Sequence, residues 1–359
     1  MDQNRDLLYL MNQVACPAFS VKNGQIDLVN SDAEHILITS GTPILPMLIT
    51  GKTEYQQLPV GGCLSVLLDT EQSEVTAFVC RREEQDLFLL DQDYDEPALM
   101  ALTLASSSLR VPLSNIINSV QNVRRHPENV DSYTESELNS IYKGAFQILR
   151  MVANMTDVLS YRQRRMAREA VNLEALFQET VDKAALLLEK KNIQVTFSCS
   201  VEDPMTIGNR EQLERALNNL ILNAASKPSR TQTPKIHVAL TESEGRYYLS
   251  VTDNGQGIPD EIFGTIFAHY RRNPSTTGVY TGIGLGLPIV RAVAIAHSGA
   301  VLMERLSPSG VKVTMTIKAT PVSTKQLYSP RFSFDYTSEF DHSLVEFSGI
   351  LPAEDYSHN

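Results

Sequence analysis

The chain contains few residues of the kinds that build disulfide frameworks or metal sites. Among 359 residues there is no tryptophan, and there are four cysteines, at positions 16, 63, 80 and 199. No two of them form a C-x-x-C pair, so the simplest interpretation is four reduced core residues. The seven histidines are scattered without H-E-x-x-H spacing, so we expect no metal site built from protein ligands alone.

Basic clusters and long apolar runs are also scarce. The chain has 31 Lys and Arg against 42 Asp and Glu, a net charge of -11, which argues against a surface for nucleic acid or anionic membrane. The longest apolar stretch, Ile36–Ile49, is interrupted by glycine and proline and is too short to span a bilayer. The N-terminus lacks the charged-then-apolar order of a signal peptide. We therefore expect a cytoplasmic protein, with two or three domains at this length.

Residues 1–92 predict a small mixed α/β domain. Two strands flank the turn Lys22-Asn23-Gly24, and later strands are expected at Ser65–Leu68, Val75–Cys80 and Leu87–Leu90. Gly51-Lys52-Thr53 is interpreted as a loop, because Pro46 stands where a phosphate-binding P-loop needs glycine. The strand-turn-strand segment from Pro17 to Glu34 resembles the opening of a PAS sensor domain. The same pattern fits equally a packing or dimerising domain that binds no ligand.

Residues 93–168 predict a hairpin of two long helices. Apolar residues recur every three or four positions in both, at Leu102, Ala105, Leu109, Leu113, Ile116, Val120 and Val123, and at Leu138, Ile141, Ala145, Ile148, Val152, Met155 and Leu159. Pro112 is expected to kink the first helix. Because such a hairpin cannot cover its own apolar stripe, we expect a homodimer in which two hairpins form a four-helix bundle.

Residues 169–320 change to a mixed pattern. Alternation from Ile193 to Val201 predicts a half-buried strand, and Glu211–Ala225 predicts a helix. A mostly antiparallel sheet with helices on one face accounts for the order of elements, so the fold class is α+β. The tail, residues 321–359, has no obvious element. We favour a strap over a disordered tail, because its apolar residues are costly to leave in water: Leu344, Val345, Phe347, Ile350 and Leu351.

Three segments in the 169–320 region carry chemistry. Asn219 and Asn223 are four residues apart on one helix face, and amide oxygens there can hold a Mg²⁺ that bridges phosphates. Asp253 ends a strand, and the glycines that follow let the backbone approach a ligand. A buried carboxylate there can accept a hydrogen bond from the exocyclic amino group of adenine, worth about 1.5–3 kcal/mol.

The third segment, Gly282-Ile283-Gly284-Leu285-Gly286-Leu287, runs directly into a helix. Backbone N–H groups at a glycine-rich helix start form a phosphate cradle. Residues 259–281 lie between the two glycine clusters and include Arg271 and Arg272, which suits a lid over bound phosphates.

Asn219–Asn223, Asp253–Ile258, Ile266-Phe267 with Arg272, and Gly282–Leu287 resemble the N, G1, F and G2 boxes of the sensor histidine kinase catalytic domain. That family belongs to the ATPase superfamily of gyrase, Hsp90 and MutL, so the resemblance implies a two-layer Bergerat-type ATP-binding domain. It implies that Asn223 holds Mg²⁺, that Asp253 recognises adenine and that Arg272 is catalytic. The ATP-binding residues it implies are Asn219, Asn223, Lys227, Asp253, Gly255, Gly257, Ile258, Phe267, Gly282, Gly284, Leu285, Gly286 and Leu287. Lys227 comes one residue later than the family's lysine, which weakens its assignment to phosphate.

The first hairpin helix departs from that family. Its segment Ser106–Leu113 resembles the family's Ser-His-Glu-Leu-Arg-Thr-Pro-Leu, but Ser107 stands at the phosphate-accepting histidine and Ser108 at its acidic helper. An imidazole attacks a γ-phosphate near neutral pH, whereas a serine hydroxyl with no base beside it does not. Histidine autophosphorylation is therefore not expected. Three functions stay open. The first is an ATP-binding signalling protein that switches conformation with nucleotide or engages a partner, either a response regulator or a partner kinase. The others are a kinase that phosphorylates serine or a partner, and a scaffold that binds no nucleotide.

Overall fold

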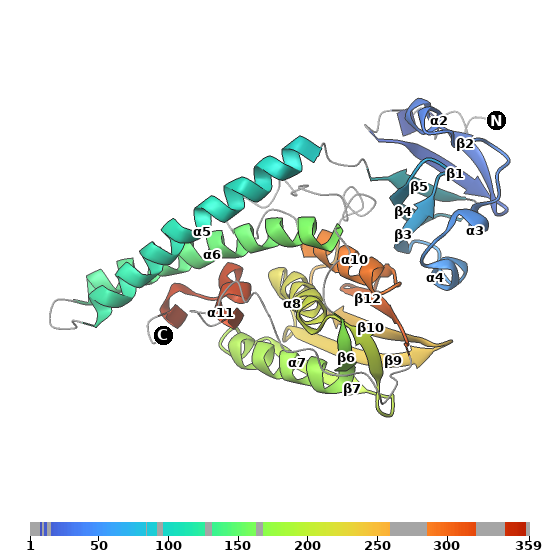
Figure 1. Cartoon of the computed structure of the whole chain (residues 1–359). Coiled ribbons are helices and arrows are strands. Elements are labelled where there is room, and N and C mark those ends of the chain that lie inside the picture. Colours follow the sequence, from blue (N-terminus) through green and yellow to red (C-terminus); the bar gives the residue numbers. More distant parts are fainter. Residues whose placement is uncertain are drawn as a thin grey trace.

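The computed structural model describes residues 8, 11–12, 16–83, 85–91, 96–125, 131–162, 168–258, 286–320 and 342–356. An N-terminal domain, a long helical hairpin and a C-terminal lobe follow one another along the chain (Figure 1). Ten described strands form one sheet that runs through both globular parts, in the order β2-β1-β5-β4-β3-β11-β12-β10-β9-β7. Of the helices in these ranges, none combines the length and the apolar character needed to cross a membrane.

The N-terminal domain contains half of that sheet. Its elements are β1 Ala18–Lys22, β2 Gln25–Val29, α2 Ser31–His35, α3 Ile44–Met47, α4 Lys52–Gln56, β3 Cys63–Asp69, β4 Glu74–Arg81 and β5 Asp86–Leu90. The predicted hairpin is confirmed, with Asn23 and Gly24 both at positive φ in its turn. Asn30 caps α2 by accepting a hydrogen bond from the Ala33 amide at 2.9 Å.

The interpretation of Gly51-Lys52-Thr53 as a loop is wrong. Gly51 has φ +76° and caps α4, which begins at Lys52. A Cβ at position 51 would lie 2.8 Å from Cγ1 of Val66 and 3.1 Å from Cβ of Ala300. Glycine is therefore required here because the residue that caps α4 has a left-handed backbone conformation and packs tightly on the sheet. It does not belong to a phosphate-binding loop.

Two long helices, α5 Glu96–Arg124 and α6 Ser132–Arg162, pack against each other. α5 continues through Pro112. The predicted stripe is only partly correct for a single chain. The buried apolar residues of α5 and α6 are Leu113, Ile117, Val120, Leu138, Tyr142, Ala145, Phe146, Leu149, Val152 and Ala153. Other members of the predicted stripe are exposed: Leu109, Ile116, Val123, Ile141 and Ile148.

The C-terminal lobe contains the other half of the sheet. Its elements are β6 Glu169–Asn172, α7 Leu173–Glu189, β7 Gln194–Cys199, β8 Met205–Gly208, α8 Arg210–Ser226, β9 Lys235–Ser243, β10 Arg246–Asp253, α10 Gly286–Ala296, β11 Val301–Arg305 and β12 Val311–Lys318. Only β7 and β9 pair in parallel among the described strands, so the prediction of a mostly antiparallel sheet is confirmed. Helices α7, α8 and α10 lie on one face of this half-sheet (Figure 1). Two details differ from expectation: β7 ends at Cys199, and β6 and β8 form a separate small sheet.

The two halves of the sheet join where β3 pairs with β11, through Ser65 with Val301, Leu64 with Leu302, and Cys63 with Met303. Side chains tie the junction on both faces. The carboxylate of Glu54, 3% exposed, accepts a hydrogen bond from the Thr316 hydroxyl at 2.6 Å. On the helical side, Arg291 donates to Asp91 at 2.6 Å.

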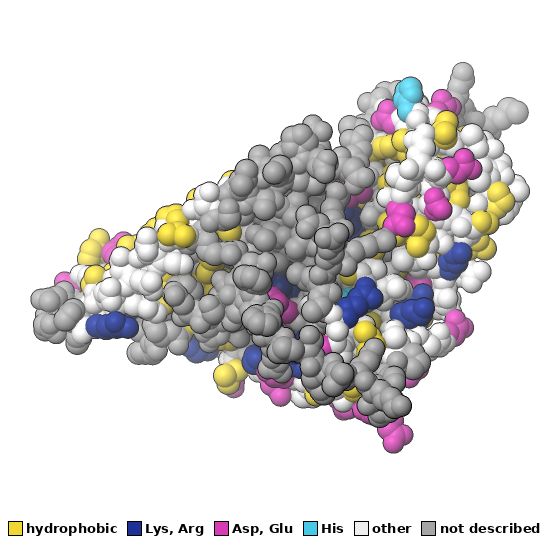
Figure 2. Space-filling model, in the orientation of Figure 1, with side chains coloured by type: hydrophobic (Ala, Val, Ile, Leu, Met, Phe, Trp, Pro, Cys, Tyr) yellow, Lys and Arg dark blue, Asp and Glu magenta, His cyan; other side chains and the backbone are white. Residues whose placement is uncertain are grey.

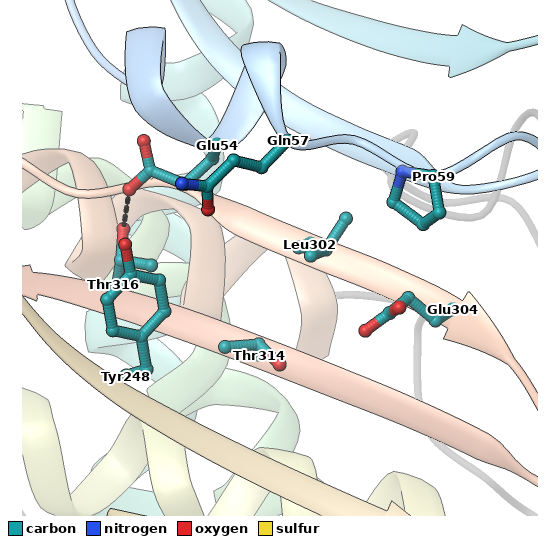
Figure 3. Close-up of a pocket in the computed structure, with 8 residues that line it drawn as sticks. All are labelled: Glu54, Gln57, Pro59, Tyr248, Leu302, Glu304, Thr314 and Thr316. Carbon is teal, nitrogen blue, oxygen red and sulfur yellow. Dashed lines mark hydrogen bonds between the residues drawn. The ribbon is translucent and has the colours of Figure 1, made fainter. Parts of the chain in front are cut away.

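A cavity of about 170 Å³ lies at the same junction. Figure 3 shows Glu54, Gln57 and Pro59 from the N-terminal domain on one side, and Leu302, Glu304, Thr314, Thr316 and Tyr248 from the lobe on the other. The N-terminal domain thus joins the lobe edge to edge through β3 and β11, and α4 with the segment after it faces one side of the lobe's sheet across this cavity.

The end of the chain forms the C-terminal strap, which we define as residues 342–356. It consists of α11 His342–Glu346, η2 Phe347–Gly349 and η3 Ala353–Tyr356, and it packs along α6. Its apolar side chains are buried, at 0–4% exposure for Leu344, Val345, Phe347 and Leu351. The expectation that these residues are kept out of water is confirmed.

Glu346 is the charged centre of the strap. Its carboxylate, 1% exposed, lies 3.5 Å from the guanidinium of Arg215 in α8 and 3.8 Å from that of Arg150 in α6. Gln147 of α6 also donates to the Ser348 carbonyl at 3.1 Å. The strap therefore bridges the hairpin and the C-terminal lobe.

Candidate functional site

Helix α8 carries the two asparagines that the sequence singled out. Asn209 starts the helix by accepting a hydrogen bond from the Gln212 amide at 2.9 Å. Asn219, one turn before Asn223, is fully buried, and its Nδ2 donates to the Arg215 carbonyl at 2.9 Å. Its Oδ1 is buried and has no hydrogen-bond partner among the described residues. A buried acceptor in that state costs about 1–3 kcal/mol unless something supplies a donor or a cation.

The start of α10 lies directly against these asparagines. A Cβ built at Gly286 would lie 3.1 Å from Oδ1 of Asn219 and 3.5 Å from Oδ1 of Asn223. Glycine at this position thus lets the first turn of α10 approach both amide oxygens. The predicted residues Gly282, Gly284 and Leu285 lie outside the described residues, as do Phe267 and Arg272.

Asp253 ends β10 between two strands, opposite Ile236 of β9 and Val311 of β12. Its Oδ1 accepts a hydrogen bond from the Gly255 amide at 2.8 Å. Burial raises the pKa of Asp253 above its usual value, while the amides of Gly255 and Val311 oppose that rise by favouring the carboxylate. The group is a largely desolvated acceptor on a rigid strand end.

The loop after Asp253 is held by its neighbours. Asn254 accepts from the Lys235 amide at 2.8 Å and donates to the Thr233 carbonyl at 3.0 Å. Gly257 has φ +74°, which favours glycine. The loop has no helix or strand structure, so these hydrogen bonds and the Gly257 backbone determine its conformation.

Lys227 meets this loop through its backbone. It caps the end of α8, and its carbonyl accepts from the Gln256 amide at 3.2 Å. A Cβ at Gly255 would lie 2.5 Å from the same oxygen. The end of α8 therefore joins the asparagine pair to the Asp253 loop, whereas a phosphate contact by the Lys227 side chain stays a prediction.

Ile258 and Leu287, the apolar members of the predicted set, are partly buried against the main hydrophobic core. Ser107 belongs to α5 by its backbone, but its side chain lies outside the described part of the chain. Among the predicted residues, the structure thus brings together Asn219, Asn223 and Gly286 in one group, and Asp253, Gly255 and Lys227 in another.

Sequence reasoning missed Gly310. It has φ +110°, and a Cβ there would overlap the carbonyl oxygen of Asp253. Only glycine therefore lets the β11–β12 turn close over the end of β10. The Pro308-Ser309-Gly310 triplet is a turn signal, but nothing local in it points to Asp253, 57 positions earlier in the chain.

Comparison with known proteins matches this region to one family. Residues 208–321 match the model of the histidine kinase-, DNA gyrase B- and HSP90-like ATPase. The chain is 26% identical over 268 residues to hybrid signal transduction histidine kinase D of Dictyostelium discoideum, covering 73% of this chain and 17% of that protein. It is 28% identical over 217 residues to cyanobacterial phytochrome A of Nostoc sp., covering 60% of this chain and 28% of that protein. The chain thus corresponds to less than a third of either relative.

Among solved structures, full-length ShkA in complex with AMPPNP has a similar fold, with a TM-score of 0.51 and 19% identity over 62% of this chain and 47% of that one. The family match covers α8, the Asp253 loop and α10, which are the elements that assemble the candidate site. Residues 208–321 therefore form a histidine kinase-, DNA gyrase B- and HSP90-like ATPase domain, and the longer matched stretch is similar to signal transduction histidine kinases.

Proposed function

We propose that the protein is a histidine kinase-type signalling protein that binds ATP and Mg²⁺ in the C-terminal lobe and takes no phosphate on histidine in its hairpin. The observation that carries the proposal is the buried Oδ1 of Asn219, which lies beside the start of α10. Among the described residues this oxygen has no hydrogen-bond partner. A helix start attracts phosphate, and an amide oxygen beside it suits the accompanying Mg²⁺ or a water bound to it.

Each residue of the site has a role that its environment supports. Asp253, held by Gly255 at 2.8 Å, would accept a hydrogen bond from the adenine amino group. Asn223 is exposed beside Gly286, so its amide oxygen is available to hold Mg²⁺. Gly286 would leave room for phosphate at the start of α10. Bound ATP supplies the phosphoryl group, and the residues named here bind and orient it.

The binding proposal is tested by thermal unfolding with and without ATP and Mg²⁺. A nucleotide at a hundred times its Kd stabilises the folded chain by about 2.7 kcal/mol. We expect this increment in the wild type, a smaller one in Asp253→Asn, and an undiminished one in Asp203→Asn, which alters an exposed aspartate of the same lobe. Equal increments in the wild type and Asp253→Asn would remove Asp253 from the site, and no increment in any variant would favour the scaffold.

The fate of the γ-phosphate is tested with labelled ATP. Ser107 carries no imidazole and has no acidic helper at position 108, so we expect no acid-labile label on the chain. Acid-labile label would contradict the proposal by requiring a phosphohistidine. Acid-stable label that disappears in Ser107→Ala would replace it with the serine kinase hypothesis. Transfer to an added response regulator or partner kinase is a separate arm of the same assay.

We also propose that the hairpin dimerises. Leu109, Ile116 and Val123 on α5 are 43–46% exposed and seven residues apart, and Ile141 and Ile148 on α6 repeat that spacing at 49% and 39% exposure. Figure 2 shows hydrophobic side chains at the surface of the hairpin. A seven-residue repeat of exposed apolar side chains is the seam of a helical bundle, so a second hairpin fits this face. The PAS-like interpretation of residues 1–92 stays a prediction.

A further inference from the structure

The fold brings together two cysteines that are far apart in the sequence. Cys63 on β3 and Cys80 on β4 are directly opposite in the antiparallel register, and their Sγ atoms are 2.7 Å apart. In the next pair along the two strands, Gly62 and Arg81, the Arg81 amide donates a hydrogen bond to the Gly62 carbonyl at 3.0 Å. Since hydrogen-bonded and non-hydrogen-bonded pairs alternate, Cys63 and Cys80 occupy a non-hydrogen-bonded pair, where side chains are closest.

This geometry suits a disulfide without movement of the backbone. Non-hydrogen-bonded pairs have Cα atoms about 4.5 Å apart, which lies within the range of about 4.4–6.8 Å that disulfides accept. Neither cysteine is in a disulfide in the structure, and the pair is accessible from one side, because Cys80 is partly exposed while Cys63 is 2% exposed.

The surroundings favour reaction at Cys80. A hydrogen bond from the Cys63 thiol holds the pKa of Cys80 below its usual value, and the cations of Arg82 and Arg305 act in the same direction against the effect of burial. The interaction with Cys80, together with burial, raises the pKa of Cys63. A thiolate flanked by cations and reachable by solvent is the reactive form of cysteine.

We propose that Cys63 and Cys80 form a redox modification site that hydrogen peroxide converts into a disulfide across β3 and β4. The Cys80 thiolate attacks one peroxide oxygen, the O–O bond breaks, and Cys80 becomes a sulfenic acid while hydroxide leaves and takes up a proton as water. Cys63 then loses its proton and attacks the Cys80 sulfur, which forms the S–S bond and releases the second water. Two thiols and one peroxide thus give one disulfide and two waters.

The site lies at the junction of the two halves of the sheet. Cys63 pairs with Met303 of β11 on its other side, and Arg305, which acts on both thiols, comes from the same strand of the ATPase lobe. The β3–β11 pairing therefore places the Arg305 cation beside the thiols. Oxidation would cross-link β4 to β3, the strand that pairs with β11 of the lobe. This inference does not depend on nucleotide binding.

The test uses the reduced full-length chain exposed to hydrogen peroxide under native conditions, followed by alkylation of the remaining thiols and peptide mapping without reduction. We expect two of the four thiols to become unreactive, a cross-linked peptide pair containing Cys63 and Cys80, and full recovery with dithiothreitol. Cys16 and Cys199, each partly buried, serve as internal controls and should stay alkylatable.

Two variants separate the steps. Cys63→Ala should stop at a Cys80 sulfenic acid that dimedone traps, and Cys80→Ser should give neither cross-link nor sulfenic acid at Cys63. The proposal is overturned if Cys63 and Cys80 remain alkylatable while another cysteine oxidises, or if cross-links join other cysteines. Peptide mapping of the wild type decides the matter even if a variant fails to fold.

Discussion

Replacing Glu346 by glutamine is expected to lower the free energy of unfolding by about 3–5 kcal/mol, the cost of breaking a buried ion pair from one side. The carboxylate and the Arg215 guanidinium it faces are each 1% exposed. Glutamine keeps the shape of the side chain and its packing, so the loss comes from removing the negative charge that faces Arg215 in a desolvated site. Were the pair worth no more than a surface salt bridge, the change would be about 0–1 kcal/mol.

The measurement is urea unfolding followed by far-UV circular dichroism, because the chain has no tryptophan to report by fluorescence. Glu242→Gln is the matched control, since Glu242 is exposed on β9. If the two variants lose the same stability, the strap is not held by its charge. A second variant, Arg215→Met, should cost less in the Glu346→Gln background than in the wild type, because the two positions share one interaction.

Three further predictions concern the lobe and the hairpin. His297 is buried, its Nε2 accepts from the Asn209 amide at 3.1 Å, and burial lowers its pKa. The unfolded chain therefore takes up the proton first, so stability should fall as pH drops below about 6.5, and His297→Gln should flatten that fall between pH 7.5 and 5.5. Gly310→Ala should weaken ATP binding as well as stability. The control Gly245→Ala is also at positive φ but has no atom within 4 Å of the added Cβ, so it should cost only about 1–2 kcal/mol of stability and leave binding intact. Equal ATP affinities in the two variants would refute the link to Asp253. Ile116→Glu should shift the chain from dimer to monomer in analytical ultracentrifugation, and an unchanged mass would exclude that face from the dimer interface.

Much of the fold follows from local patterns. The turn at Asn23 and Gly24, the strand that ends at Asp253, and the helix that carries Asn219 and Asn223 are each specified by residues close in sequence. The roles of Asp253, Asn219 and Asn223 in the site were predicted from residue chemistry and by resemblance, and the structure adds the approach of Gly286 to both asparagines.

Features that depend on distant pairing were not predictable. Short apolar runs mark β3 and β11 as strands but do not say that they pair, because register and partner depend on the whole sheet. Cys63 and Cys80 look scattered in the sequence for the same reason. Helical periodicity predicted apolar positions on α5 and α6, yet it could not separate Leu113, buried within one hairpin, from Ile116, which stays exposed.

The pairing of β3 with β11 also bears on solubility. β11 has β12 on one side and β3 on the other, so the described sheet ends at β2 and β7 and not at the boundary of the ATPase lobe. A fragment that begins at residue 168 would expose the backbone N–H and C=O groups along Val301–Met303, which form a template for pairing with another chain. The N-terminal domain therefore covers this edge of the ATPase lobe, and its removal should make the lobe prone to self-association.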